Sequence, residues 1–353
     1  ADSVGWAARP ISYRKLASSE LGIPAGAWRM RVTEGNDQKS VYYDARLNPV
    51  LEEEKDTASG VLRYLRRSYD HDSRVTFQSY PSATSTASSG INSFYDTLGR
   101  LTQRRTTDNI TLEQIAYLSA NRKQITDADG RVSTISYQAF DQPGYSKPTL
   151  VVAPEGQTTT ITRDVFGKIT AVTQSGLYLG SPLSFTRSFS YDSYQRPCRR
   201  EDPESGSTVW GYNLASEVTW EARGQSGSGC LSSAPSAASL FEYWPRGNKK
   251  KDDYPGTGED VSYSYDPALN LTGVSNAIAA WSYSHNKRNL LEFEQAVIDG
   301  KTFVLDPSYT TLATLSSLST PGQTISYSPD AWGRPSQLGS YASGIQYHPN
   351  GIP

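Results

Sequence analysis

Cysteine, histidine and methionine are rare in this sequence. Its 353 residues include two cysteines, three histidines and one methionine. Cys198 and Cys230 are too few for the disulfide framework of a small secreted domain, and they could pair or stay as two free thiols. His71, His285 and His348 are far apart, no two have metal-ligand spacing, and no CxxC occurs. We therefore expect no metal site and no cofactor.

The sequence also has no large excess of positive or negative charge and no long apolar run. The formal net charge is -2, from 34 basic and 36 acidic residues. This balance argues against nucleic acid as a partner, because phosphate binding normally requires a basic surplus. No apolar run reaches the ~18–20 residues of a membrane helix. The first residues, "ADSVGWAARP", lack the basic and apolar parts of a signal peptide, so any export signal lies upstream, has been removed or is of another type.

Tyrosine and turn-forming residues are abundant instead. Hydrophobic residues make up 36%, below the usual ~45–50% of a globular domain. There are 23 tyrosines and 7 tryptophans, and 28 glycines and 20 prolines are spread along the chain. Tyrosine favours half-buried pleated surfaces, and dispersed glycine and proline indicate many turns. This composition predicts an all-β protein.

Two short motifs recur along the chain. Tyr-Asp pairs begin at Tyr43, Tyr69, Tyr95, Tyr191 and Tyr265. Asp-x-x-Gly followed by Arg or Lys begins at Asp96, Asp127, Asp164 and Asp330. Degenerate copies such as "YDSYQR" and "YWPRGN" fill the gaps, so that tyrosines recur every ~18–31 residues, a period typical of repeat proteins.

Alternating sequence flanks each motif, as in "VSYSYD" and "KITAVT", which is the period-two pattern of a strand. Aspartate is favoured at the first position of a type I turn, and glycine three residues later accepts the positive φ that closes such a hairpin with a bulge. Each copy therefore predicts strand, tight turn and strand. The predicted turn residues are Tyr95, Asp96, Gly99, Arg100, Asp127, Gly130, Asp164, Gly167, Asp330 and Gly333.

A few stretches depart from this pattern. "NITLEQIAYLSANRKQ" (109–124) is the best helical candidate, but "TLEQIAYL" also alternates and its position between two turn signals favours a strand. Residues 222–240 are rich in Ser, Gly and Ala and predict a long loop, and residues 80–90 predict a shorter one. Residues 1–40 carry no clear repeat and predict an N-terminal connector or sheet edge.

Together these motifs resemble the YD-repeat family, also called rearrangement hotspot (RHS) repeats. "YDTLGRL" (95–101) matches the family pattern throughout, and "DADGRVSTISY" and "APEGQTTTITRD" match its second half. The resemblance covers residues 41–353. It implies successive antiparallel β-hairpins in a curled, spiralling sheet that is part of a hollow β-shell. In bacterial members such a shell encloses a toxic C-terminal polypeptide, so the resemblance also implies a secreted or cell-surface protein with an enclosed toxin, of the same or an associated chain, as partner.

The sequence departs from a complete family member. "LDPSYTT" near Asp306 has the Asp-Pro of the autoproteolysis motif but not the Gly-Leu that follows it in relatives. No cargo segment is present, and the chain ends at "YHPNGIP" within a repeat-like stretch. We therefore expect a shell segment that is incomplete at its C-terminus.

Catalytic signatures are weak. G-x-S-x-G, Walker-type and G-x-G-x-x-G loops are absent. Neighbouring acidic residues such as Asp252 and Asp253 point to opposite faces of a strand and cannot face each other across a cleft. We expect no enzyme activity in this segment. The alternative is an adhesin-like repeat surface that binds a glycan or a cell-surface protein through exposed Tyr and Trp. An enzyme acting on polysaccharide is a third hypothesis, which requires two carboxylates ~5–9.5 Å apart in a cleft.

Overall fold

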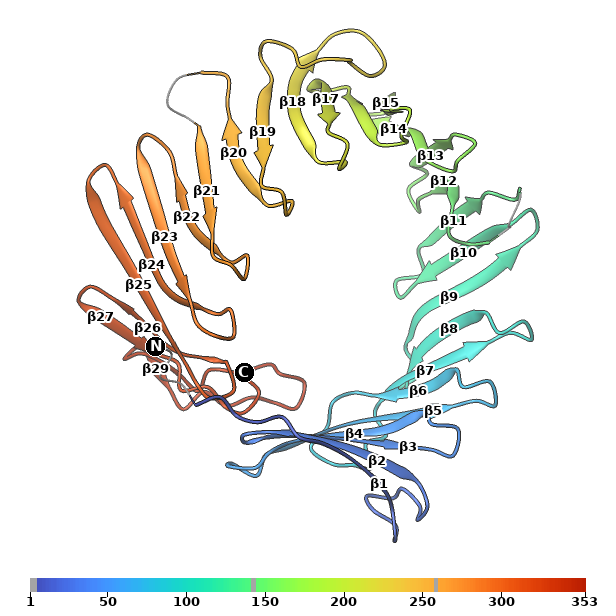
Figure 1. Cartoon of the computed structure of the whole chain (residues 1–353). Coiled ribbons are helices and arrows are strands. Elements are labelled where there is room, and N and C mark those ends of the chain that lie inside the picture. The colour runs from blue at the N-terminus through green and yellow to red at the C-terminus, as the bar shows by residue number, and fades with distance from the viewer. Residues whose placement is uncertain (1–4, 141–143, 257–259) are drawn as a thin grey trace. The chain divides into compact units, whose positions relative to one another are not determined.

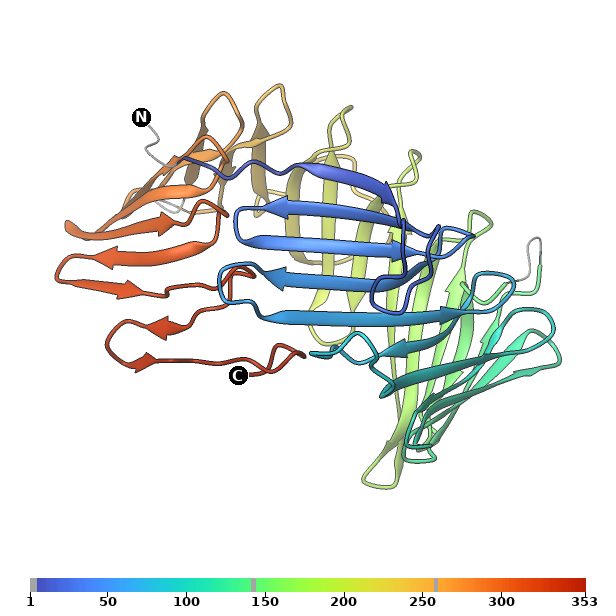
Figure 2. The same ribbon diagram turned by 90° about the horizontal axis from the view of Figure 1, so that it is seen from below.

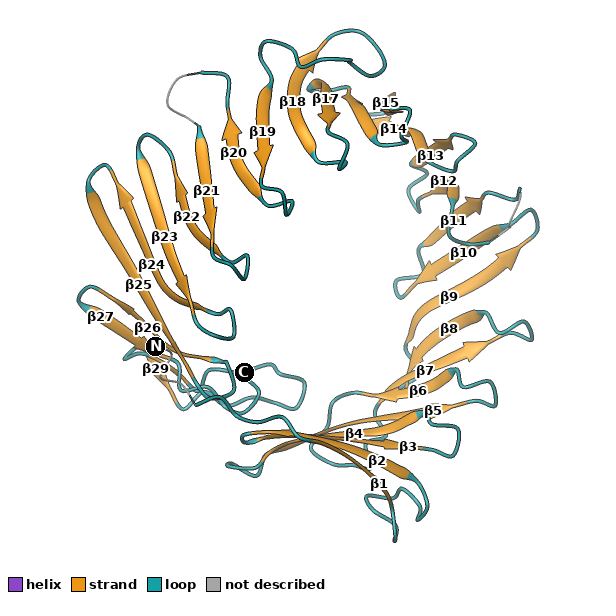
Figure 3. Cartoon of the chain, in the orientation of Figure 1, coloured by secondary structure: helices purple, strands orange, loops and turns teal. Residues whose placement is uncertain are grey.

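The computed structural model describes residues 5–140, 144–256 and 260–353. Within these ranges the chain forms strands, turns and loops and no helix (Figure 3). The all-β prediction is therefore confirmed. Residues 1–4 of the predicted N-terminal segment 1–40 lie outside the described residues, and its boundary with the repeats at residue 41 stays a prediction.

The strands follow one another as antiparallel hairpins. The recorded registers join strands that are consecutive in sequence, such as β7 (Gly90–Tyr95) with β8 (Leu101–Thr106). Among the described residues, β1 to β27 belong to one sheet of 27 strands, and β28 and β29 form a separate pair. This confirms the prediction of successive antiparallel hairpins. By its internal contacts the chain divides into two compact units, which we describe in turn.

The first unit contains the described residues up to Gln114, Tyr283–Ala296 and Lys301–Pro353 (Figure 1). Its strands are β1 (Ile11–Lys15), β2 (Trp28–Glu34), β3 (Asp37–Tyr43), β4 (Pro49–Asp56), β5 (Leu62–Tyr69), β6 (Val75–Ser79), β7, β8, β25 (Lys301–Tyr309), β26 (Leu315–Thr320), β27 (Gln323–Ser326), β28 (Gln337–Leu338) and β29 (Ala342–Ser343). The strands β9 (Thr111–Leu118), β23 (Ala279–His285) and β24 (Leu291–Ile298) contain the boundaries between the units.

The second unit contains the described residues of Ile115–Ser282 together with Val297–Gly300. Its strands are β10 (Arg122–Asp127), β11 (Val132–Tyr137), β12 (Pro148–Val152), β13 (Thr158–Arg163), β14 (Ile169–Tyr178), β15 (Ser181–Tyr191), β16 (Pro197–Asp202), β17 (Gly206–Tyr212), β18 (Val218–Gln225), β19 (Ser239–Tyr243), β20 (Lys249–Asp253), β21 (Val261–Tyr265) and β22 (Leu271–Ser275). The helical candidate at 109–124 is strand in β9 and β10, as its alternating pattern favoured.

Buried apolar side chains gather where a segment outside the repeats covers the sheet. In the first unit, Leu16, Ile23 and Ala27 come from the connection between β1 and β2, and they cluster with Tyr42 of β3 and Leu51 of β4. Tyr64 of β5 completes this cluster. Such burial contributes about 1.5–3 kcal/mol for each fully covered large side chain.

A second, smaller cluster lies in the second unit, where the loop between β18 and β19 covers the sheet. Ala238 at the end of this loop packs with Val209 and Ala222. Cys230 of the loop forms a disulfide with Cys198 of β16, with Cα atoms 5.2 Å apart. The stretch predicted as a long loop is therefore fixed to the sheet, and the two cysteines pair.

The neighbouring Arg199 holds the same loop by hydrogen bonds. Its buried guanidinium donates to the carbonyl oxygens of Gly229 (2.6 Å), Ser226 (3.3 Å) and Gln225 (3.4 Å). One guanidinium thus binds three backbone carbonyls at the end of β18 and in the loop, and it holds this segment to β16.

Within the first unit, late segments of the chain lie against the first strands (Figure 2). The Ala7 amide donates to the Thr311 carbonyl at 3.0 Å. Arg288 forms an ion pair with Glu34 at 3.1 Å, and it also donates to the Ala7 carbonyl. These contacts join parts of the chain that are about 250–300 residues apart in sequence.

Candidate functional site: the repeated turn

Fifteen turns within the described residues share one backbone geometry. If the first residue of a turn is position 0, its amide donates to the carbonyl of position +4, and the amide of position +3 donates back to the carbonyl of position 0. The turns begin at Asp44, Asp70, Asp96, Thr106, Asp127, Ala153, Asp164, Asp192, Asn213, Trp244, Asp266, Asn286, Thr310, Asp330 and His348. Position +3 has positive φ in every one of them. This is the bulged hairpin turn that the motif predicts.

The turn at Tyr95–Arg100 contains the complete motif. The Asp96 carboxylate accepts hydrogen bonds from the amides of Leu98 (3.0 Å) and Arg100 (2.9 Å). The Arg100 guanidinium in turn contacts the other Asp96 oxygen, with Nε at 2.8 Å and Nη2 at 2.7 Å. Asp96 therefore caps the turn, and Arg100 closes an ion pair over it.

The other predicted aspartates lie in the same arrangement. Asp127 accepts from the amides of positions +2 and +4, as does Asp164. Asp330 does the same and also pairs with the guanidinium of Arg334 at 2.7 Å. The glycines Gly130, Gly167 and Gly333 occupy position +3 with φ near 80°. The structure thus places the predicted residues at four separate turns, and it does not gather them into one cleft.

Two complete Asp–Arg turns were absent from the predicted set because they lack the glycine. Asp70 pairs with Arg74 and Asp192 with Arg196, while Ser73 and Gln195 adopt positive φ at position +3. The signal that would have found them is an arginine four residues after the aspartate of a Tyr-Asp pair. That spacing persists where the glycine does not.

Six of the tyrosines that directly precede a turn bind the turn before it. In each case the hydroxyl donates to the carbonyl of position +5 of the preceding turn. These bonds join Tyr69 to Pro49, Tyr95 to Val75, Tyr191 to Ile169, Tyr212 to Pro197, Tyr243 to Val218 and Tyr347 to Pro335, over 2.6–3.1 Å. Each such tyrosine therefore ties one hairpin to its predecessor, which explains why the pair is Tyr-Asp and not Asp alone.

The cation at position +4 makes a second link between neighbouring turns. The guanidinium of Arg74 lies 5.1 Å from the ring centre of Tyr95, and that of Arg196 lies 4.6 Å from the ring centre of Tyr212. Arg334 over Tyr347 and Lys168 over Tyr191 repeat the contact at 4.5 and 4.9 Å. Such cation–π contacts contribute about 0.5–1 kcal/mol each at exposed sites.

Glycine at position +3 also makes room for this cation. A Cβ added to Gly99 would collide with Nη1 of Arg74, the +4 residue of the preceding turn. In the same way, a Cβ on Gly333 would come within 2.9 Å of Thr314, which is again the +4 residue of the preceding turn. The +4 side chain therefore lies between the tyrosine and the +3 residue of the next turn.

The carboxylates of Asp96 and Asp192 are held in their ionised form. The hydrogen bond from the Arg100 side chain, with those from two backbone amides, lowers the pKa of Asp96. At Asp192, burial acts to raise the pKa, but hydrogen bonds from the Arg196 amide and side chain outweigh it and lower the pKa. A carboxylate that already accepts several hydrogen bonds and an ion pair is a poor general acid or base at neutral pH.

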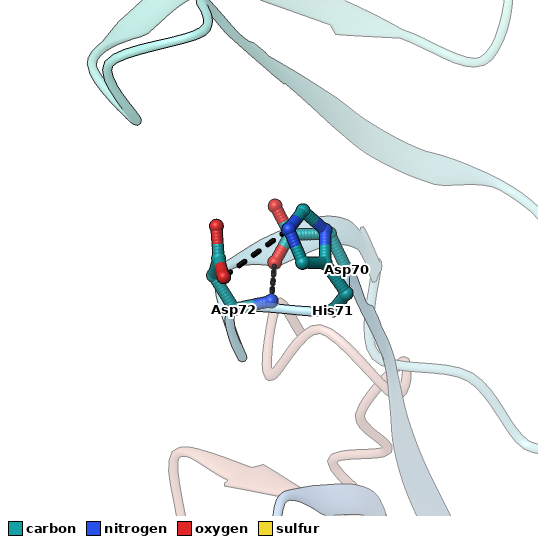
Figure 4. Close-up of side chains that lie close together, drawn as sticks. All are labelled: Asp70, His71 and Asp72. Carbon is teal, nitrogen blue, oxygen red and sulfur yellow. Dashed lines mark hydrogen bonds and ion pairs between the residues drawn. The ribbon is translucent and has the colours of Figure 1, made fainter.

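One group of potential metal ligands occurs in the described parts of the chain, at Asp70, His71 and Asp72 (Figure 4). The Asp70 carboxylate is the cap of its own turn and accepts from the Asp72 amide at 2.9 Å. Arg74 forms ion pairs with both carboxylates, at 2.6 Å to Asp70 and 3.0 Å to Asp72. Because the Arg74 guanidinium already pairs with both carboxylates, we assign no metal to this group.

The fold and its turns define a repeat protein of antiparallel β-hairpins, in which each turn is bound to the next. Among solved structures, the chain is similar to the crystal structure of TcdB2-TccC3-Cdc42, with a TM-score of 0.56 and 11% identity, over 83% of this chain and 18% of that chain. TcdB2-TccC3 without its hypervariable C-terminal region aligns over 92% of this chain and 22% of that chain, at 10% identity and a TM-score of 0.47.

The first of these similarities shows a shared fold. This chain spans about a fifth of the length of those chains. No family model and no curated protein matches the sequence. In the residues that the structure describes, no helix is long and apolar enough to cross a membrane.

Proposed function

We propose that this chain is a segment of a β-shell that encloses a toxic polypeptide of the same or an associated chain. The observation that carries the proposal is the chain-order series of hairpins with one repeated turn, combined with the similarity of fold to TcdB2-TccC3-Cdc42. The sequence motifs of the YD-repeat family support the same function independently of the fold. A protein with this function is secreted or exposed on the cell surface.

The distribution of buried residues also supports this proposal. Fourteen apolar residues of the described chain are buried, far fewer than a globular protein of this length would bury. Most strand residues, as in β10 and β12, are half-buried on both faces. A sheet that is stabilised along its turns leaves its faces available, which is what a container wall requires.

We also propose that this segment catalyses no reaction. The aspartates that recur in the sequence are engaged by amides and guanidinium groups of their own turns, as at Asp96 and Asp192. Replacing Asp96 by Asn should therefore change stability and leave any activity of the complete protein intact. A loss of activity in a variant with native stability would contradict this part of the proposal.

Protease protection in the natural full-length protein tests enclosure. The complete polypeptide, with any associated chain, is treated with a broad-specificity protease before and after the sheet is opened by urea. We expect a fragment distinct from the repeats that survives digestion in the native protein and is cleaved once the sheet unfolds. Cleavage of every non-repeat segment at equal rates in both states would refute enclosure.

A further inference from the structure

The hairpin of β14 and β15 is the longest of the second unit. Its strands contain 10 and 11 residues, more than any other strand among the described residues. Pairing of β14 with β13 ends at Ser175, and pairing of β15 with β16 ends at Ser188. Residues 176–183 therefore have no flanking strand on either side in the described chain, and they pair only with each other. From Ser175, β14 continues to Tyr178, about 10 Å further along the strand.

Large apolar side chains occupy this end of the hairpin and are exposed. Leu177, Tyr178 and Leu179 are 72%, 65% and 90% exposed, and Leu183 and Phe185 of β15 are exposed as well. In the recorded register, Tyr178 shares a face with Leu183 and Phe185. Leu177 lies on the opposite face, and Leu179 lies in the turn. These five residues, which we call the apolar tip, therefore cover both faces and the end of the hairpin.

The turn of this hairpin does not require an apolar residue. Leu179 and Gly180 form a two-residue turn with φ of +49° and +80°. Asparagine followed by glycine is the pair that such a turn favours, whereas leucine rarely adopts positive φ. Neither the backbone conformation nor burial therefore accounts for the leucine.

The hairpin carries no charged residue between Lys168 and Arg187. The hydroxyls of Ser175 and Ser184, which lie opposite each other, are joined by a hydrogen bond of 2.9 Å. Pro182 lies in the part of β15 that no strand flanks, and it has no amide hydrogen that could be left without a partner. Moving this end of the hairpin into an apolar medium therefore removes no charge from water and leaves few polar groups unpaired.

An occupant of the apolar tip has to cover both faces and the end of the hairpin at once. A folded protein that packs against the face of Tyr178 leaves Leu177 in water on the other face. The headgroups and acyl chains of a bilayer are fluid, and they surround a projecting element on all sides. A lipid surface therefore fits the shape of this hairpin better than a protein surface does.

The turns on either side of the hairpin indicate the charge of the lipid. Antiparallel pairing places the β12–β13 and β16–β17 turns at the same end of the strands as the apolar tip. Glu155 lies in the first of these turns and Glu204 in the second, and both side chains are exposed. Anionic headgroups repel carboxylates, so a zwitterionic surface is favoured.

We propose that the apolar tip inserts into the surface of a zwitterionic lipid bilayer, to the depth of about 5–10 Å that is typical of interfacial elements. The hairpin lies in the headgroup and upper acyl region and does not span the bilayer. This binding goes beyond the proposed enclosing function and does not depend on it. The competing occupant is an apolar surface of another protein, a second copy of this chain included.

Co-sedimentation of the full chain with phosphatidylcholine vesicles tests the proposal. Leu179→Asn removes the apolar end and supplies the residue that the turn favours, so this variant should fold at least as well as the parent. Leu177→Thr removes a second apolar side chain and keeps a residue of high strand propensity. Leu214→Asn is the matched control, because this leucine is 96% exposed at another turn of the second unit.

We expect the parent to bind these vesicles, and its partition constant to fall at least about tenfold in Leu179→Asn and in Leu177→Thr. It should be unchanged in Leu214→Asn, and phosphatidylserine in the vesicles should not strengthen it. The proposal is overturned if the parent does not bind, if Leu179→Asn binds as well as the parent, or if only vesicles with phosphatidylserine bind. It is also overturned if, in sedimentation velocity without lipid, the parent self-associates through the tip while the vesicles do not bind it.

Discussion

The strands β3 and β4 of the first unit differ from β21 and β22 of the second in how they are stabilised. In the first pair, Tyr42 and Leu51 are fully buried beneath the segment that contains Leu16 and Ile23. In the second pair no residue is buried, yet the turn at Asp266 has the same backbone hydrogen bonds as the turn at Asp44. The same turn geometry thus occurs where another segment covers the sheet and where no segment covers it. An apolar core is therefore a local addition to this fold, and the backbone hydrogen bonds of the repeated turn are common to both regions.

The largest effect is expected from a substitution in the buried cluster of the first unit, which should leave the uncovered strands unaffected. Replacing Leu51 by Ala should cost about 3–5 kcal/mol, because its side chain is completely buried and leaves a cavity. Native-state hydrogen exchange of the β3–β5 amides measures this free energy. The matched control is Leu98→Ala at a turn where the leucine is 75% exposed, with an expected change within about 0.5 kcal/mol. Similar costs in both variants would show that the covering segment contributes nothing.

The disulfide gives the next largest effect, in the second unit. It closes a loop of 32 residues, so replacing Cys198 and Cys230 together by Ser should cost about 2–4 kcal/mol. Exchange of the β16–β18 amides reports the loss, and a reducing agent should reproduce it in the unmodified protein. Unchanged exchange in both experiments would mean that Arg199 and the small apolar cluster hold the loop without the disulfide.

Neighbouring turns of the first unit test the requirement for positive φ. Gly333→Ala should destabilise the protein by about 1–2 kcal/mol, because φ is +78° and the new Cβ meets Thr314. Ala313→Gly, at φ +63° in the preceding turn, should stabilise it by about 0.5–1 kcal/mol. Thermal unfolding measures both shifts, and effects of the same sign would contradict the assignment of position +3.

These turns also show how far the sequence predicts the structure. Asp96, Asp127, Asp164 and Asp330 were predictable because aspartate and glycine act locally, through hydrogen bonds and φ within four residues. The turns at Asp70 and Asp192 were also indicated by their Tyr-Asp pairs, but the positive φ of Ser73 and Gln195 was not predictable, because neither residue type favours it. A local energetic preference is visible in sequence, while one imposed by the sheet is not.

Contacts between residues of neighbouring repeats could not be predicted from the sequence either. Nothing in "YDTLGR" shows that the Tyr95 hydroxyl reaches the Val75 carbonyl, or that Arg74 covers the Tyr95 ring. The pairing of Cys198 with Cys230 was likewise open, because it depends on the loop folding back onto β16. Such contacts depend on the register of distant strands, which local patterns do not fix.

Acid should weaken the turns by a smaller amount. The pKa of Asp96 is lower in the folded chain than its ordinary value near 3.9. Its contribution to stability is therefore complete above about pH 4 and is lost as pH falls through the lowered folded value. The midpoint of urea unfolding followed from pH 7 to pH 2 checks this, and Asp96→Asn should show a shallower acid dependence. If the midpoint of the variant changed with pH as that of the parent does, Asp96 would not contribute to the loss of stability in acid.

A double-mutant cycle between Arg196 and Tyr212 tests most directly whether neighbouring turns stabilise each other. Arg196 lies 4.6 Å from the Tyr212 ring centre and donates to the Asn213 carbonyl of the next turn at 2.8 Å. For Arg196→Gln and Tyr212→Leu we predict a coupling free energy of about 0.5–1 kcal/mol. The control pair Arg196→Gln and Tyr191→Leu should be additive, because Lys168 covers the Tyr191 ring. Additive effects in the first pair would contradict the coupling of turns on which this description of the fold depends.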